Sequence, residues 1–214
     1  MTKALYVWEF PVRLTHWVNV VAIVMLSVTG FYIGAPFIHA VRENQFIMAK
    51  MRYIHFISAY VFVVSFLVRI YWWFAGNKYA RMNQFIFVNA ARWKNTIDTA
   101  LFYAFLKDDL PHSPGHTGMA GLTYFTLFIV FVIEILTGFA LFSETHGGGW
   151  LMTVAGGWLF SFMSTGTVRL IHHCVLWIIV AFTIIHVYIS WHNDIVERNG
   201  LTSSIFSGYK NMEE

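Results

Sequence analysis

The stretch RLIHHCVLWIIVAFTIIHVYISWH, residues 169–192, decides the fold of this 214-residue chain. It is an apolar run long enough to cross a lipid bilayer as a helix, yet it contains histidines. His172 and His186 are 14 residues apart, so a helix places them ~40° apart around its axis and ~21 Å apart along it. Neutral imidazoles at two depths of one membrane helix are costly in lipid unless they have partners.

The composition of the whole chain is that of a polytopic membrane protein. Hydrophobic residues make up 57% of the chain and charged residues only 12%, too few for the surface of a soluble domain. Four apolar segments predict membrane spans at about residues 14–37, 53–74, 119–142 and 169–192. We therefore expect an all-α membrane protein, a four-helix transmembrane bundle in which residues 1–214 form a single domain.

The segments outside the spans give three further expectations. Residues 83–106 predict an amphipathic helix on the membrane surface, between the second and third spans. Its apolar residues recur at four-residue spacing: Trp93, Ile97, Leu101 and Phe105. The apolar middle of the loop 143–168 is too short to span and is expected to rest at the interface or against a partner. The tail, residues 199–214, is expected to be loosely structured.

The distribution of lysine and arginine predicts the orientation. With both termini inside, the inner segments carry nine basic residues: Lys3, Arg13, Lys78, Arg81, Arg92, Lys94, Lys107, Arg198 and Lys210. The outer segments carry four: Arg42, Lys50, Arg52 and Arg169. The excess predicts cytoplasmic termini, and the modest net charge of +3 indicates loop charge rather than a nucleic-acid-binding surface.

With this orientation the histidines pair by depth. His16 begins an outward-going helix and His186 lies deep in the last inward-going helix, so both lie near the inner face. His55 and His172 begin inward-going helices and lie near the outer face. Each pair could clamp one haem between two helices, because axial imidazoles hold haem iron. The pairing therefore predicts two haem groups.

Arginines and a glycine support the haem interpretation. Arg13, Arg52 and Arg169 each precede one of these histidines by three residues, one helical turn away on the same face. An arginine there could bind a haem propionate. Arg69 lies at the depth of the inner pair and needs an anionic partner in lipid. Gly30, at the depth of the outer pair, lets a macrocycle approach its helix.

Other interpretations of the histidines agree less well with the sequence. His172 is preferred to His173 as a ligand because it shares a face with His186 and has the arginine three residues before it. Zinc, copper or non-haem iron would need ligands that converge on one point, which the ~21 Å separation opposes. The single cysteine, Cys174, excludes an intramolecular disulfide and a cysteine-ligated iron–sulfur cluster.

Five stretches give the chain a resemblance to a known family. They are RLTHW (13–17), MRYIHF (51–56), GHTGMAG (115–121), LTGFALFSE (136–144) and RLIHHCVLWIIVAFTIIHVY (169–188). At these residues the chain resembles the b-type cytochrome subunit of membrane-bound nickel–iron hydrogenases. The histidine pattern is shared in looser form with the cytochrome b subunits of formate dehydrogenase and thiosulfate reductase.

The resemblance implies a function in electron transport. It implies a four-helix cytochrome of the bacterial inner membrane with up to two haem b groups. A periplasmic iron–sulfur small subunit, joined to a nickel–iron large subunit, would deliver electrons from hydrogen. They would pass by the outer and inner haems to a quinone of the respiratory chain, menaquinone or ubiquinone. The chain would then be the quinone-reducing subunit of a hydrogen:quinone oxidoreductase, without the hydrogen-activating site.

A quinone site is expected near the inner haem. The candidate residues lie in the segment that leads into the third span: His112, His116, Thr117 and Gly118. A histidine there could donate to a quinone carbonyl and relay a proton, and a helix-capping loop is the structural alternative. Glu134, inside the third span, has no partner identifiable from sequence, and a hydrogen bond to a neighbouring helix is expected.

The sequence is also compatible with two alternatives to the hydrogenase function. The first is a cytochrome b subunit of formate dehydrogenase or of another periplasmic oxidoreductase, which copurification would identify. The second is a haem-free transporter whose histidines carry protons or metal ions. Proton transfer gives no reason for the repeated arginine spacing.

Overall fold

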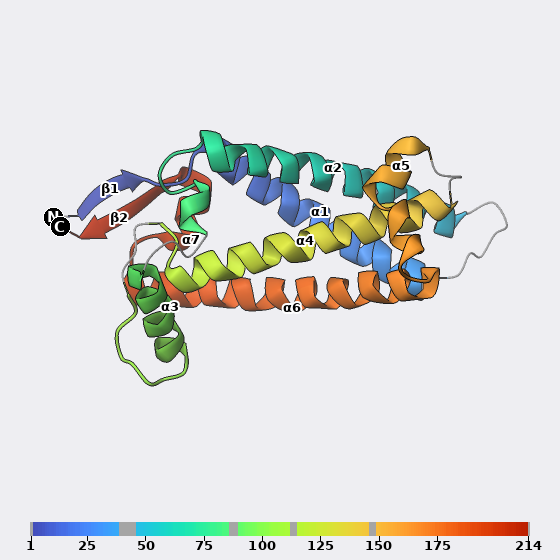
Figure 1. Ribbon diagram of the computed structural model, residues 1–214. Coiled ribbons are helices and arrows are strands. Elements are labelled where there is room, and N and C mark those ends of the chain that lie inside the picture. The colour runs from blue at the N-terminus through green and yellow to red at the C-terminus, as the bar shows by residue number, and fades with distance from the viewer. Residues whose placement is uncertain (1, 39–45, 86–89, 112–114, 146–148, 214) are drawn as a thin grey trace. The chain divides into compact units, whose positions relative to one another are not determined.

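The chain is mostly helical in the computed structural model, which describes residues 2–38, 46–85, 90–111, 115–145 and 149–213. The helices and strands, in order, are β1 (Thr2–Tyr6), α1 (Phe10–Gly34), α2 (Ile47–Ala75), η1 (Met82–Gln84), α3 (Ala90–Tyr103), α4 (Gly118–Thr145), α5 (Trp150–Ala155), η2 (Gly157–Ser161), α6 (Thr165–Glu197), α7 (Leu201–Ser207) and β2 (Tyr209–Glu213) (Figure 1). η1 and η2 are short 3₁₀ helices.

Four of these helices, α1, α2, α4 and α6, are long and apolar enough to cross a membrane. They coincide with the four predicted spans, so the expected class of helical membrane protein is confirmed. The ends of the helices differ from the predicted ones: α1 begins before residue 14 but ends at Gly34, short of residue 37, whereas α2, α4 and α6 extend beyond their apolar stretches at both ends. α2 begins at Ile47 rather than near residue 53, and α6 runs to Glu197, because helical hydrogen bonding continues into the polar flanks.

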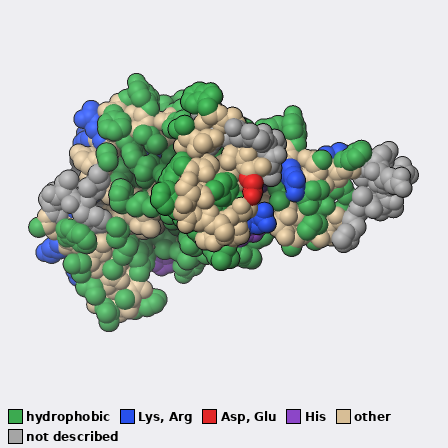
Figure 2. All heavy atoms as spheres, turned by 45° about the vertical axis from the view of Figure 1, so that its right-hand side comes forward, with side chains coloured by type: hydrophobic (Ala, Val, Ile, Leu, Met, Phe, Trp, Pro, Cys, Tyr) green, Lys and Arg blue, Asp and Glu red, His purple; other side chains and the backbone are tan. Residues whose placement is uncertain are grey.

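The surface is strongly apolar, as lipid contact requires. Figure 2 shows hydrophobic side chains over much of the face drawn, with few charged ones among them. On the spans, large aliphatic side chains such as Val21, Val64 and Ile184 are exposed. Apolar side chains on the outside of a helix bundle are favourable in lipid and unfavourable in water.

The structure divides into two compact units, which are described separately. Unit 1 comprises residues 1–84, 110–116 and 193–214, and unit 2 comprises residues 85–109 and 117–192. The expectation that residues 1–214 form a single domain stays a prediction.

Unit 1 contains the antiparallel helices α1 and α2 and joins the two ends of the chain. β1 and β2 form an antiparallel pair in which Thr2 lies opposite Glu213 and Tyr6 opposite Tyr209. The indole Nε1 of Trp8 donates to the Ser204 hydroxyl of α7 at 3.0 Å. The expectation of a loosely structured tail at residues 199–214 is therefore wrong. Its order comes from pairing with residues some 200 positions away, which no local pattern reveals.

The start of α1 and the end of α2 are also tied together in unit 1. A carboxylate oxygen of Glu9 accepts from Trp72 Nε1 at 2.9 Å and from the Asn77 backbone N–H at 2.7 Å. Val7, Trp8, Val12 and Ala80 form a small buried cluster beside these bonds. These contacts fix the register of α1 against α2.

Unit 2 contains α3, α4, α5, η2 and most of α6. The apolar loop before α6 packs on α4, where Ala140, Leu159 and Val168 are buried together. The surface helix predicted at 83–106 corresponds to α3, which is shorter than predicted and has the bounds Ala90–Tyr103. Its Trp93 and Ile97 are exposed, as expected of a face that meets the membrane.

Candidate functional site

In unit 1, the first two candidate ligands lie on neighbouring helices, His16 on α1 and His55 on α2. Thr29 of α1 lies beside His55, with its Oγ1 2.9 Å from His55 Nδ1. At the other end of the pair, the Ser65 hydroxyl of α2 donates to the Thr15 carbonyl at 3.3 Å. Thr29, the residue before Gly30, therefore lies beside His55. Thr15, the residue before His16, lies beside Ser65.

Two of the candidate propionate arginines also belong to unit 1. Arg13 donates from Nη1 to the backbone carbonyl of Phe206 in α7. Arg69 is buried, and its Nη1 lies 3.4 Å from the carbonyl oxygen of Ala80. A guanidinium has five N–H donors, so one bond to a carbonyl is compatible with a further anionic partner. Arg52 is exposed in the first turns of α2, one turn before His55.

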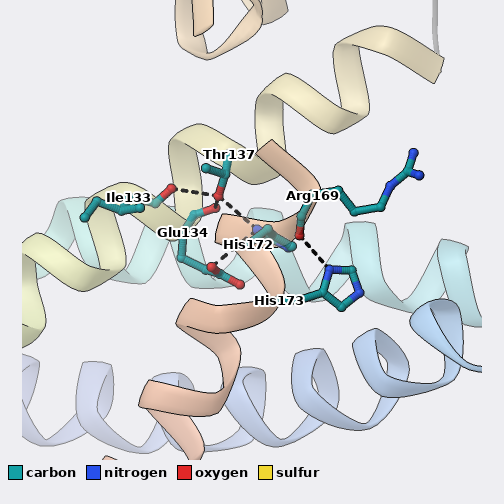
Figure 3. Close-up of polar contacts among 6 residues, drawn as sticks. All are labelled: Ile133, Glu134, Thr137, Arg169, His172 and His173. Carbon is teal, nitrogen blue, oxygen red and sulfur yellow. Dashed lines mark hydrogen bonds and ion pairs between the residues drawn. The ribbon is translucent and has the colours of Figure 1, made fainter. Parts of the chain in front are cut away.

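In unit 2, His172 of α6 faces Glu134 and Thr137 of α4 (Figure 3). Its Nδ1 lies 3.0 Å from Thr137 Oγ1 and 3.3 Å from Glu134 Oε2. A Cβ placed on Gly138 would lie 3.3 Å from His172 Cε1, so the glycine leaves room for the imidazole. α4 therefore supplies a hydroxyl, a carboxyl and a gap for one ring.

The adjacent His173 has a different environment. Its Nδ1 bonds to the Arg169 carbonyl of its own helix at 2.8 Å. Figure 3 shows the ring of His172 turned towards α4, and the guanidinium of Arg169 pointing away from both histidines. The contacts thus distinguish the two histidines: His172 is held by another helix and His173 by its own backbone.

The fourth candidate ligand, His186, lies 14 residues after His172 on the same helix, α6. Its ring stacks on that of Phe182, one turn earlier, with centroids 5.5 Å apart and planes inclined by 16°. His172 and His186 belong to unit 2, whereas His16 and His55 belong to unit 1. The pairing of histidines between these helices therefore stays a prediction.

The candidate quinone residues are only partly described. His112 lies outside the described residues. The ring of His116 lies against Trp8 in unit 1, with centroids 4.8 Å apart in an edge-to-face arrangement. The Thr117 hydroxyl accepts from the backbone N–H of Ala120, as a helix N-cap does.

Gly118 has a packing role at the start of α4. Its N–H donates to Asn95 Oδ1 of α3 at 2.6 Å, and an added Cβ would lie 2.3 Å from Thr96 Oγ1. The capping and packing of Thr117 and Gly118 agree with the structural alternative for this segment. The quinone role of the segment stays a prediction.

The sequence reasoning missed the threonines that contact the histidines, although a repeat could have revealed them. The tripeptide Thr-Gly-Phe occurs at 29–31 in α1 and at 137–139 in α4. In each unit its threonine contacts Nδ1 of a candidate ligand on the other long helix. In α4 its glycine leaves space for the ring.

The donor set fits haem b. The threonine contacts occupy Nδ1 of His55 and of His172, and an imidazole that donates from Nδ1 presents the lone pair of Nε2 to a metal. Among the described residues, no three His, Cys, Asp or Glu side chains converge as they would around a zinc or non-haem iron ion. Single imidazoles at separate positions suit axial ligation, in which the macrocycle supplies the other ligands.

Comparison with known proteins identifies the family. The family model described as prokaryotic cytochrome b561 matches residues 7–208. A relative from Cupriavidus necator, named probable Ni/Fe-hydrogenase B-type cytochrome subunit, is 39% identical over 99% of this chain and 89% of its own length. A relative of the same name from Azotobacter chroococcum is 36% identical over 99% of this chain and 90% of its own length.

A third relative, from Escherichia coli K12, is named probable Ni/Fe-hydrogenase 1 B-type cytochrome subunit. It is 34% identical over 96% of this chain and 90% of its own length. The similarity thus covers all four membrane helices and every candidate ligand. The four apolar helices, the histidines that they carry and this full-length similarity together show that the chain belongs to the prokaryotic cytochrome b561 family.

Proposed function

We propose that this cytochrome b is the membrane-anchoring di-haem subunit of a nickel–iron hydrogenase complex, and that it passes electrons to membrane quinone. The observation that carries the proposal is the near full-length similarity to relatives named as hydrogenase B-type cytochrome subunits. The partner would be a periplasmic hydrogenase with an iron–sulfur small subunit and a nickel–iron large subunit.

In this proposal four histidines hold two haem b groups. His55 and His172 would ligate the outer group, and His16 and His186 the inner one. When bound, haem b supplies a one-electron ferric–ferrous couple. Arg13, Arg52, Arg69 and Arg169 would neutralise propionates, and Gly30 would allow close packing of the macrocycle.

The proposed orientation is supported by the ends of the chain. β1 and β2 pair with each other, which agrees with an even number of membrane spans, because an even number leaves both ends of the chain on the same side (Figure 1). The excess of lysine and arginine then favours the cytoplasmic side of the bacterial inner membrane for both termini. Electrons would enter from the periplasm and leave near the cytoplasmic face.

The quinone site would lie at that exit, next to the segment with His112, His116, Thr117 and Gly118. His116 could donate to a quinone carbonyl or move a proton.

Replacing His116 by phenylalanine would keep an aromatic ring against Trp8 and remove both nitrogens. We expect a higher KM for quinone with unchanged haem content. An unchanged KM would place the site elsewhere.

Single histidine variants of the complete complex test the proposal. Replacement of His16, His55, His172 or His186 by alanine is expected to lose a haem and to stop quinone reduction. Hydrogen oxidation with benzyl viologen as the acceptor should continue, because that reaction needs only the partner subunits.

The matched control is His173→Ala, next to His172 on α6. His173 bonds to the backbone of its own helix, so this variant should keep both haems. Retention of both haems in His172→Ala, with loss in His173→Ala, would reverse the ligand assignment. Retention of both haems in each of the four ligand variants would contradict the proposed site as a whole.

A further inference from the structure

Glu134 is an acidic residue inside a membrane span to which the proposed electron route assigns no role. Acidic side chains within a span are expensive and are therefore functional candidates. In the structure Glu134 Oε2 lies 3.3 Å from Nδ1 of His172, across the contact between α4 and α6 (Figure 3). Thr137, one turn further along α4, approaches the same nitrogen at 3.0 Å.

The hydrogen-bond pattern fixes which atom donates. A threonine hydroxyl carries a single proton. The Thr137 hydroxyl donates it to the Ile133 carbonyl at 2.8 Å. Its oxygen can then only accept from His172, so the proton between them belongs to Nδ1. The Thr137 oxygen thus serves as the acceptor of the N–H, and the carboxyl oxygen Oε2 of Glu134 lies 3.3 Å from the same nitrogen as an ion-pair contact.

The same arrangement holds the other proposed outer ligand. The Thr29 hydroxyl donates to the Met25 carbonyl at 2.6 Å, and its oxygen lies 2.9 Å from His55 Nδ1. In both histidines this pattern favours the tautomer that presents Nε2 to a metal. At His172 the carboxyl of Glu134 joins the threonine.

We propose that Glu134 is a positioning residue for His172, and that it lowers the midpoint potential of the haem that His172 ligates. The inference rests on the proposed function, in which His172 is an axial ligand. A carboxylate close to the Nδ1–H of an imidazole stabilises positive charge on the ring and makes it a more basic ligand. A more basic ligand stabilises ferric over ferrous iron, which makes the couple harder to reduce.

This role would give the electron route a direction. In the proposed topology His172 belongs to the periplasmic pair, where electrons enter. A lower potential there than at the cytoplasmic pair favours electron movement towards quinone.

Potentiometric titration of the purified complex, followed by haem absorption, tests the inference without an activity assay. Glu134→Gln keeps the shape of the side chain and removes its charge. We expect unchanged haem content and an upward shift of one midpoint potential. A tenfold change in the one-electron equilibrium corresponds to about 59 mV, and we expect a shift of that order.

The matched control is Glu144→Gln on the same helix. Glu144 accepts from the Thr165 hydroxyl at 2.6 Å and lies ~15 Å along the axis from Glu134. This variant should leave both potentials unchanged. Equal shifts in Glu134→Gln and Glu144→Gln would overturn the inference, because a general charge effect would then explain both.

A second pair of variants covers the case in which Glu134→Gln does not assemble. Thr137→Val removes the acceptor of the His172 Nδ1–H and should raise the same potential, and Thr137→Ser should restore it. Thr123→Val is its control, because the Thr123 hydroxyl makes the same type of backbone bond, to Met119 at 2.9 Å. Thr123 precedes Thr137 by 14 residues, ~21 Å along α4.

The outcomes separate this inference from the proposed function. Full haem content with unchanged midpoint potentials in Glu134→Gln would overturn the inference alone. Where Glu134→Gln does not assemble, the same result in Thr137→Val would overturn it. Absence of haem from the unmodified complex would overturn the proposed function and the inference with it.

Discussion

His55 and His172 are each held at Nδ1 by a threonine from the neighbouring long helix of the same unit. The histidines themselves could be selected from the sequence, because an imidazole within an apolar run needs a partner. The threonines are marked in the sequence only by the repeated tripeptide Thr-Gly-Phe, since a threonine in a membrane helix ordinarily bonds to its own backbone. Thr29 and Thr137 do so as well, and only the packing of the helices shows that their oxygens face a histidine.

A second residue that the sequence did not single out is Lys210, a buried lysine in β2. Its side chain is 2% exposed, and its Nζ lies 5.7 Å from the centre of the Trp8 ring. Burial lowers the pKa of Lys210 below the ordinary value of 10.5, although the charges of Glu197 and Asp194 act in the opposite direction. The folded chain therefore releases this proton at a lower pH than the unfolded chain.

This difference predicts a pH dependence of stability. Between the lowered pKa of Lys210 and 10.5, the unfolded state binds more protons, so the free energy of unfolding rises with pH. Lys210→Met removes the group and should flatten this rise. Thermal unfolding in detergent at a series of pH values, followed by tryptophan fluorescence, would measure it.

The control for Lys210→Met is Lys3→Met, since Lys3 is exposed on the paired strand β1. We expect Lys3→Met to keep the wild-type profile. Parallel profiles for the wild type and Lys210→Met would show that burial of Lys210 does not control this pH range.

At the scale of the elements, the apolar runs predicted all four spans but not their ends. Hydropathy locates the stretch that lies in lipid, whereas a helix ends where its hydrogen bonds and caps end. The shortened α3 and the helical turns of α5 and η2 depend on contacts with α4. Such contacts are non-local, so no local periodicity shows them.

The packing of η2 on α4 gives a prediction for Gly156. A Cβ on Gly156 would lie 2.4 Å from the Leu136 carbonyl oxygen and 2.5 Å from the Ala140 amide nitrogen. Both atoms belong to helix backbone and cannot move aside. We expect Gly156→Ala to lower the free energy of unfolding by about 1–3 kcal/mol, the usual range for overpacking.

Gly149→Ala is the matched control, because a Cβ on Gly149 meets no atom within 4 Å. Its effect should stay within about 0.5 kcal/mol. Thermal or denaturant unfolding of both variants in the same detergent compares them. Equal stability of the two variants would mean that the loop does not pack on α4 as described.

At the scale of the whole molecule, the depth predicted for each histidine follows from the order and the predicted direction of the spans. That arithmetic needs only hydropathy, the count of basic residues and the rise per residue. The pairing across helices needs more, because His55 belongs to unit 1 and His172 to unit 2. The terminal sheet of β1 and β2 could likewise not be predicted from the sequence, since its strands lie at opposite ends of the chain.

The proposed outer pair predicts a shared response to two distant substitutions. If His55 and His172 ligate one haem, Thr29→Val and Thr137→Val should shift the same midpoint potential, because each removes an acceptor from one of its axial ligands. Potentiometric titration of both variants and of the double variant would show this. Shifts of two different potentials would assign the two histidines to different haems.

The most direct test of the central claim is the haem content of the purified complex. A pyridine haemochrome assay, combined with a protein determination, counts haem b per chain. The account predicts a value near two, which falls by one when any of His16, His55, His172 or His186 is replaced by alanine. A complex purified intact but without haem b would contradict the account.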